Sequence, residues 1–472
     1  DGPRAEAEAW ARFGSKDAAA LSRAAILRGR DLEDRRSAHA TWAAAARLRP
    51  DDLSLRWGIV GQSLGLGDAQ QAEREARAFV MELGALLHGS GATAGRLEDA
   101  LRSAAEELGL RAQVFSTPTS LMIAFGEAGA QSTQLVRVAP GDVHLEKLAL
   151  VDAVATRVGR GLLTTRDGRR ELRRIVEAPN RYSTPLLIVA QALITGAAAR
   201  LFSGGLADIV AAAALGAMVG VITAVFHRHE HGSRIVDFAA GVTAAAGAVM
   251  IDRFVAPVST YTVTLAAIIV LVPGLTLTVS MSELATRNLV SGTARLMGGL
   301  MILVSLGFGV AVGRHVEAVL PGSSTAAKAT ELFGEPGKAA AIVVVGFMLA
   351  IVFRARPRDI GPIVIGSAIG VYGARLGAAA FSPEIGAALG ALALGLASNV
   401  WSRVRNHPSA ITTIPGLILL VPGSIGFGGL NALLADDTVT GVDTFFTMTL
   451  VGVSIVAGLL LANVVYRGRR GV

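Results

Sequence analysis

Hydrophobic residues are spread unevenly along the 472-residue chain. Charged residues recur every few positions over residues 1–180, whereas 184–466 consists of one uncharged apolar run after another. Most of these runs are about 20 residues long, the length that an α-helix needs to cross a bilayer. The pattern predicts a soluble N-terminal region followed by an α-helical multi-pass membrane domain, and it argues against one large soluble core.

Ten membrane segments are expected from these runs. They cover residues 184–203, 206–227, 234–254, 259–281, 289–313, 339–354, 360–379, 384–403, 410–434 and 443–466. Arginines gather before the first segment and after the sixth, eighth and tenth, while the alternate loops are poorer in basic residues. Because basic loops are retained in the cytosol, we expect a plasma (inner) membrane protein with both termini cytosolic. The chain shows no charged-then-apolar leader, so no signal peptide is expected.

The charged region divides into two parts. Residues 1–75 are rich in alanine and arginine and predict a helical extension, in which "HATWAAAARLRPDD" loosely resembles a tetratricopeptide-type hairpin. Residues 76–180 predict a compact cytosolic α+β domain. Its helices are expected at "AREARAFVMELGALLHGSG" and "LEDALRSAAEELGL", and its strands at "RAQVFSTPTSLMIAFG" and "STQLVRVAP".

The motif "LVPG" occurs twice, at 271–274 and 420–423, which is an offset of 149 residues. Proline and glycine break helices, so the fourth and ninth segments are expected to be interrupted at matching places. Three further glycine pairs keep the same offset: Gly241 and Gly390, Gly292 and Gly441, Gly309 and Gly458. Each half, 184–316 and 339–466, then holds five segments. Because five is odd, the halves must be inverted, and inverted repeats with broken helices are typical of secondary transporters.

Composition narrows the chemistry. The chain has no cysteine, which excludes disulfides, thiol nucleophiles and thiolate metal sites. The net charge of +7 comes from arginines at the edges of apolar runs, which indicates membrane topology rather than a nucleic-acid-binding face. Neither GxxxxGKS nor GxxxxGKT occurs, so ATP drive by this chain is not expected. We predict no cofactor and no metal.

Five sequence stretches occur along the chain in the order in which a known protein family has similar stretches. "FVMELGALLHGSGATAGRLEDALRSAAEELGL", "VFSTPTSLMIAFG" and "LALVDAVATRVGRG" lie in the soluble region, while "LVPGLTLTVSMSELATRNLVSGTARL" and "PGLILLVPGSIGFGGLNALL" contain the helix breaks. Over residues 76–466 they resemble the threonine/serine exporter family, in its fused two-half form with a soluble N-terminal domain. The resemblance implies a transporter, not an enzyme, that exports L-threonine and L-serine by using the proton gradient. Its partners would be the amino acid, protons and the lipid bilayer, with no nucleic acid.

Such a zwitterion needs partners for its carboxylate, its ammonium and its hydroxyl. Free N–H groups after a helix break attract a carboxylate, and free carbonyls before it attract an ammonium. The expected substrate-binding residues at the breaks are Pro273, Gly274, Leu275 and Thr276 in the first half and Pro422, Gly423 and Ser424, with Ile425, in the second. The alternative is that each break only kinks a helix for packing.

Polar residues inside other segments are further candidates. Gln191 with Thr195, and Asn399 with Ser398, could bond the substrate hydroxyl or bridge helices. Glu283 and Asp237 are the candidates for proton coupling, because carboxylates inside a membrane are costly. The alternatives are an i,i+4 ion pair between Glu283 and Arg287, and a helix cap formed by Asp237.

Two rival functions stay open. His88, Glu82 and Asp99 could form a hydrolytic or metal site, which would make the protein a membrane-anchored hydrolase or peptidase whose product passes through the membrane domain. No metal-ligand spacing supports this, and "STPTS" lacks the glycines of a nucleophile elbow. The membrane domain could instead be a passive channel. Assembly into a homo-oligomer is left open by the sequence.

Overall fold

The protein was analysed as a computed structural model, which describes residues 69–127, 129, 131–139, 141–226, 235–319, 334–466 and 468, with positions 41 and 45. The helical extension and the hairpin expected over 1–75 therefore lie almost wholly outside the described residues. The chain forms two compact units, one built mainly from residues up to 179 and the other mainly from residues 180–469.

The first unit contains helices on a small sheet. Its elements are α5 (Ala69–Gly89), α6 (Ala94–Glu107), β1 (Ala112–Thr117), β2 (Ser120–Phe125), β3 (Ser132–Arg137), α7 (Leu145–Gly159) and α8 (Thr165–Glu177). The strands pair antiparallel in the order β1-β2-β3. Residues 112–125 form a hairpin rather than one long strand, because the Pro118-Thr119 turn lets Thr117 pair with Ser120.

One face of this sheet supplies the core of the first unit. Leu121, Ile123 and Phe125 alternate along β2 with less buried residues and are at most 1% exposed. They belong to the same unit as Phe79 of α5 and Leu97 of α6, which are also buried, and α6 packs on β1 while α5 packs on β2. The period-2 pattern of the strands and the 3.6-residue pattern of the helices therefore build one apolar layer.

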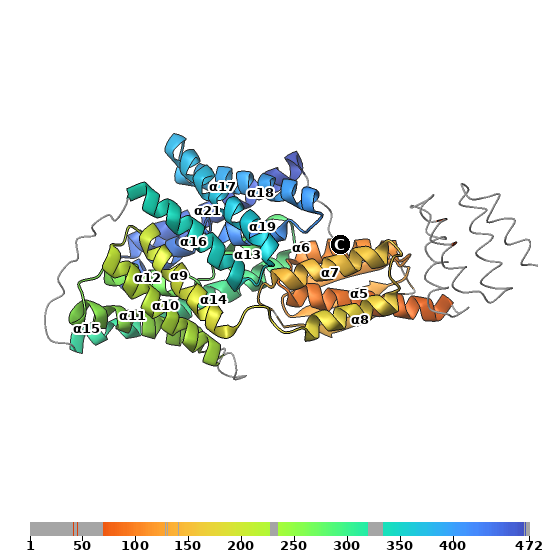
Figure 1. The fold of residues 1–472 in the computed structure, drawn as a ribbon, viewed down its shortest axis with the longest axis horizontal. Helices are drawn as coiled ribbons and strands as arrows, with labels where there is room; N and C mark the ends of the chain where they lie inside the picture. The colour runs from red at the N-terminus through yellow and green to blue at the C-terminus, as the bar shows by residue number, and fades with distance from the viewer. Residues whose placement is uncertain are drawn as a thin grey trace, which may run out of the picture. The chain divides into compact units, whose positions relative to one another are not determined.

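The second unit is helical. It contains α9 (Thr184–Leu201), α10 (Leu206–Phe226), α11 (Val236–Phe254), α12 (Thr260–Ile268), α13 (Gly274–Ala285), α14 (Leu289–Arg314), α15 (Val316–Val319), α16 (Gly334–Val352), α17 (Pro357–Ala380), α18 (Pro383–Arg405), α19 (Ala410–Ile418), α20 (Gly423–Leu434) and α21 (Thr438–Val465). Helix α9 packs against α10 and α16, α11 against α14, and α18 against both α17 and α21 (Figure 1).

Eight spans in the described chain are long and apolar enough to cross a membrane. They do not include two of the ten expected segments. The third, at 234–254, is α11, which carries Asp237, Asp252 and Arg253; the fourth, at 259–281, is split into α12 and α13, of 9 and 12 residues. Large apolar side chains such as Met301, Phe446 and Val453 are more than half exposed, as expected for surfaces that face lipid.

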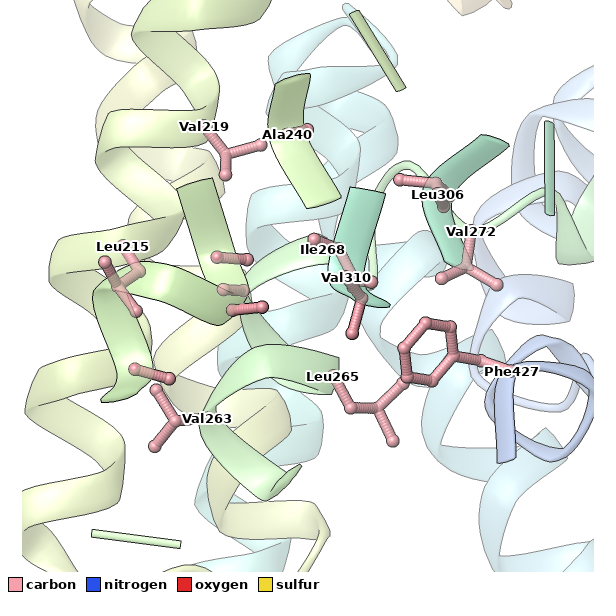
Figure 2. Close-up of a cluster of buried hydrophobic side chains, with 14 of the residues drawn as sticks. Leu215, Val219, Ala240, Val263, Leu265, Ile268, Val272, Leu306, Val310 and Phe427 are labelled. Carbon is pink, nitrogen blue, oxygen red and sulfur yellow. The ribbon is translucent and has the colours of Figure 1, made fainter. Parts of the chain in front are cut away.

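A buried apolar cluster joins the first-half helices. Leu215 and Val219 of α10, Ala240 of α11, Val263, Leu265 and Ile268 of α12, and Leu306 and Val310 of α14 meet there (Figure 2). Phe427 of α20 and Val272 of the first break complete it. The two halves therefore share a core, and the first helix break is fixed inside it.

Candidate functional site

The two helix breaks have the same local geometry. Pro273 precedes α13 with φ −77° and ψ 37°, and Pro422 precedes α20 with φ −78° and ψ 27°. Before the first break, the Ile268 carbonyl accepts two backbone N–H groups at 2.8 and 3.2 Å. The Leu417 carbonyl does the same before the second break, at 2.8 and 2.9 Å. Both LVPG motifs therefore interrupt a helix, in matching conformations.

The glycines of the two breaks lie against each other. A Cβ placed on Gly274 would lie 2.2 Å from Cγ1 of Val421 and 3.2 Å from Cα of Gly423. A Cβ placed on Gly423 would lie 2.9 Å from Cγ1 of Val272 and 3.3 Å from Cα of Gly274. Segments 149 residues apart thus meet backbone to backbone, which only glycine allows.

Helices α13 and α20 both begin where the two glycines meet, and backbone N–H groups in their first turns are without a backbone acceptor. The N–H group four positions after each proline bonds back to the proline carbonyl, at 2.9 Å for α13 and 3.0 Å for α20. Between the proline and that position, the Gly274 N–H donates to the Val272 carbonyl at 2.8 Å. The N–H groups of Leu275, Thr276, Gly423, Ser424 and Ile425 have no backbone acceptor among the described residues. The four of these that are not glycine are half-buried, while the prolines and glycines are buried. Such N–H groups, with the positive ends of two helix dipoles, favour an anion.

Glu283 is 2% exposed and lies in the last turn of α13. Its carboxylate lies 3.1 Å from Nε of Arg295 and accepts a hydrogen bond of 3.0 Å from the Ser291 hydroxyl, both on α14. The i,i+4 pairing with Arg287 considered from the sequence is not formed. Helix α13 ends at Ala285, and Arg287 is exposed with φ +65°, which takes it off the helical face.

Asp237 lies in the first turn of α11 and is half-buried. Residues 227–234, just before this helix, lie outside the described residues. Its carboxylate stands where the helix dipole favours negative charge. This geometry fits a helix cap as well as a proton site.

Gln191 and Thr195 lie on the face of α9 that packs on α10. The Thr195 hydroxyl donates to the Ala212 carbonyl of α10 at 2.9 Å and lies directly over Gly216. Gln191 is 9% exposed and lies over Gly220, and its Nε2 has no hydrogen-bond partner in the described chain. Thr195 therefore bridges two helices, while Gln191 retains a buried donor for a ligand.

Asn399 lies on α18 and serves the end of α21. Its Nδ2 donates to Oδ1 of Asn463 at 3.0 Å and to the Tyr466 carbonyl at 2.8 Å. The neighbouring Ser398 is 1% exposed, and its hydroxyl has no partner among the described residues. The side-chain donors of Asn399 thus join helix ends, and these contacts favour the bridging alternative over a substrate role.

Among the buried charged residues of the helical unit, Asp208, Asp359 and Arg200 were not predicted as site residues. Asp208 and Asp359 are each the third residue of their helix, α10 and α17, and are 4% and 3% exposed. Asp359 accepts a hydrogen bond of 2.7 Å from Nε of Arg356. Arg200, in the last turn of α9, is 4% exposed. The available signal in the sequence was a charged residue within one turn of the end of an apolar run.

The three candidates in the first unit have structural partners. Glu82 forms ion pairs with Arg169 at 2.7 Å and with Arg173 at 2.9 Å. Burial raises the pKa of the Glu82 carboxyl, but these two arginines outweigh burial and hold that pKa below its ordinary value. His88 bonds the Thr117 carbonyl at 3.0 Å through Nε2, and Asp99 pairs with its neighbour Arg102 at 3.1 Å. No group of three His, Cys, Asp or Glu residues suited to a metal occurs in the described chain.

Comparison with known proteins agrees with this architecture. Yeast proteins named pheromone-regulated membrane protein 10 are similar over most of the chain. The relative from Candida albicans is 22% identical over 388 residues, which cover 78% of this chain and 34% of the relative. Those from Pichia sorbitophila and Eremothecium gossypii are both 24% identical, cover 79% and 74% of this chain, and are themselves covered for 38% and 48% of their lengths. The chain thus spans between a third and a half of these relatives. No solved structure matches it.

Two family models, both describing threonine/serine exporters, match consecutive parts of the chain. The first matches residues 78–316 and the second residues 338–465. Their boundary falls between the two halves, and the first model also includes the soluble unit. This order confirms the resemblance drawn from the five sequence stretches, and the chain belongs to the threonine/serine exporter family.

Proposed function

We propose that this protein is a secondary active exporter of small hydroxylated amino acids, L-threonine and L-serine, which uses the proton-motive force. It would act in the plasma membrane with both termini in the cytosol. The observation that carries the proposal is the meeting of Gly274 and Gly423, which brings two open helix N-termini together inside the membrane unit.

We propose that the two halves are inverted-topology repeats. Supporting this, equivalent helices pack in equivalent ways: α11 on α14 as α18 on α21, α13 on α14 as α20 on α21, and α10 on α12 as α17 on α19. The helices α9 and α16 pack on each other, as expected for elements on either side of a pseudo-two-fold axis. We include in this proposal that all ten predicted segments cross the membrane, five in each half.

The substrate would bind between the breaks. Its carboxylate would accept the N–H groups of Leu275 and Thr276 or, in the opposite-facing state, those of Ser424 and Ile425. Gln191 could donate to the hydroxyl through its unpartnered Nε2. Because Gly274 and Gly423 touch in this conformation, the two breaks must separate to admit a substrate. Alternating access then consists of opening this contact toward one side at a time.

Proton coupling is assigned to Glu283, with Asp237 as a second candidate. The Glu283 carboxylate lies 3.1 Å from Nε of Arg295, so a proton bound to Glu283 would remove one charge of this pair and weaken the link. Since Glu283 and Arg295 lie on α13 and α14, movement of α13 away from α14 would couple protonation to the helix that follows the first break.

The direct test is transport by the purified full-length protein in proteoliposomes. We expect labelled L-threonine and L-serine to move against their gradients when a pH gradient is imposed, and to stop doing so when an ionophore collapses it. Flux that only ever runs downhill would identify a channel instead. Release of amino acid from a peptide by the protein in detergent would favour the hydrolase alternative.

A further inference from the structure

Arg200 is a buried base that forms no ion pair with any residue in the described part of the chain. It lies in the last turn of α9 and is 4% exposed. Its Nη2 donates to the Gly334 carbonyl at 2.8 Å, while Nε and Nη1 have no hydrogen-bond partner among the described residues. A guanidinium keeps its charge at every physiological pH and has five N–H donors, so several donors here stay open.

Asp208 is the neighbouring acid, and it is already used. Its Cβ lies 3.0 Å from the position of a Cβ on Gly204, in the turn that follows Arg200. One carboxylate oxygen accepts the Gly205 N–H at 2.8 Å and the other accepts the Ser259 N–H at 2.8 Å. No ion pair joins Asp208 to Arg200 within the described chain. The carboxylate therefore stabilises the start of α10 and α12 rather than neutralising the arginine.

The C-terminal dipole of α9 offsets only part of the cost of this charge. A cation in the last turn of a helix gains a modest stabilisation from the dipole. Burying a charge without a partner costs more than this gain. The nearby α9 residues Ala198 and Ala199 lie in an alanine-rich apolar cluster, which supplies no side-chain acceptor. Among the described residues, none supplies an acceptor for the remaining donors, whose chemistry suits an anion.

The fold itself does not require an arginine here. The turn after α9 and the turn after α16 have the same geometry: Ser203 and Arg354 both have positive φ, and the following N–H bonds back over five residues at 2.8 Å in each. Counting from these turns, the residue equivalent to Arg200 is Ile351, which is 7% exposed. An apolar side chain therefore satisfies the packing at this position, and the charge has another purpose.

We propose that Arg200 forms a carboxylate subsite at the end of α9, separate from the two helix breaks. This rests on the proposed function, because the carboxylate would be that of the transported amino acid. A planar guanidinium pairs with a carboxylate through two parallel N–H groups. Such a pair selects a carboxylate over an uncharged group of the same shape. The subsite holds the amino acid near the end of the segment, and the breaks hold it deeper in the unit.

The test compares Arg200→Gln and Arg200→Lys with wild type in the full-length protein. The control is Arg314→Gln, since Arg314 is also a cation in the last turn of a membrane helix but is exposed and donates to Asn431. In proteoliposomes, we expect Arg200→Gln to raise the KM for L-threonine at least tenfold with little change in maximal rate. Arg200→Lys should raise it less, and the control should not.

A binding measurement keeps the subsite testable if the proposed transport fails. L-threonine should raise the Tm of the wild-type protein in detergent, whereas L-threoninol, which lacks the carboxylate, should raise it less. That difference should shrink in Arg200→Gln, in which only the helix breaks still bind a carboxylate, and it should persist in Arg200→Lys. Because Arg200→Lys retains the charge, it provides the comparison if Arg200→Gln does not fold. Equal KM in Arg200→Gln and wild type, or equal stabilisation of wild type by both ligands, would overturn the subsite. Absence of uphill transport with the difference in Tm intact would reject the exporter alone.

Discussion

At the scale of single residues, the contact between Gly274 and Gly423 leaves no room for a side chain at either position. A methyl group on Gly274 would lie 2.2 Å from Val421, which is far inside van der Waals contact. We expect Gly274→Ala to lower the free energy of unfolding by about 1–3 kcal/mol and to reduce transport strongly. Thermal unfolding in detergent and threonine flux measure both effects.

The matched control for that substitution is Gly298→Ala. A Cβ on Gly298 meets nothing within 4 Å, and an alanine inside α14 favours the helix. Stability and flux should be unchanged or slightly improved. Equal behaviour of the two alanine variants would show that the breaks do not need to touch.

Glu82 gives a prediction in the soluble unit. Its pKa is lower in the folded protein than in the unfolded chain, so its stabilising effect is present above the unfolded pKa and is lost as the pH falls through the folded pKa. Glu82→Gln should therefore destabilise α5 and α8 by about 1 kcal/mol at pH 7 and by less at pH 3, which is below the ordinary pKa of the group. Hydrogen exchange of the full-length protein in α5 and α8 measures this.

Asp99→Asn is the control for Glu82, because the pair of Asp99 with Arg102 is exposed and local. It should shift protection by less than about 0.5 kcal/mol at either pH. A Glu82 effect of the same size at pH 7 and pH 3 would contradict the ionic explanation.

Residue partners were harder to predict than residue types. The sequence indicated that Glu283 is a costly acid, but it suggested Arg287 as the partner, because an unbroken helix brings i and i+4 together. The actual partner, Arg295, lies on the next helix, since α13 ends two residues before Arg287. Arg200 was missed for a related reason: neither its burial nor its missing partner can be read from an apolar run.

At the scale of helices, the breaks were predictable and the packing was not. Proline and glycine act locally, so both interruptions follow from the LVPG letters alone. That the interruptions face each other depends on the three-dimensional pairing of the halves. The number of segments was also uncertain for a physical reason: α11 carries three charges and α12 and α13 are short, so they differ from ordinary spanning helices.

Small residues set the distance between α9 and α10. This predicts different effects for an alanine at Gly216 and at Gly366, its counterpart in the second half. A Cβ on Gly216 would lie 2.0 Å from the Thr195 hydroxyl oxygen and displace its bond to Ala212. Gly216→Ala should cost about 1–3 kcal/mol in unfolding free energy. In the second half, a Cβ on Gly366 meets only a Leu394 methyl at 3.4 Å, so Gly366→Ala should be nearly neutral. A thermal shift of equal size in both variants would contradict this asymmetry.

At the scale of the whole molecule, the halves have matching breaks but different charges. Position 432, which corresponds to Glu283, is alanine, and Ile351 replaces Arg200. The repeated parts therefore supply the scaffold of two helix N-termini, whereas the polar residues proposed for proton coupling and for the carboxylate subsite have no counterpart in the second half. This division explains why sequence periodicity predicted the architecture more completely than it predicted the site.

The proposed proton role of Glu283 can be distinguished from a purely structural role of its ion pair by removing both charges of the pair together. Glu283→Gln removes the titrating group but leaves the half-buried Arg295 without this acidic partner, which alone can damage the fold. The double variant Glu283→Gln/Arg295→Gln removes both charges. If Glu283 carries the proton, the double variant should fold, bind L-threonine and catalyse downhill flux, yet show no acceleration by a pH gradient. If the pair only fastens α13 to α14, uphill transport should survive in the double variant, and the assignment would be wrong.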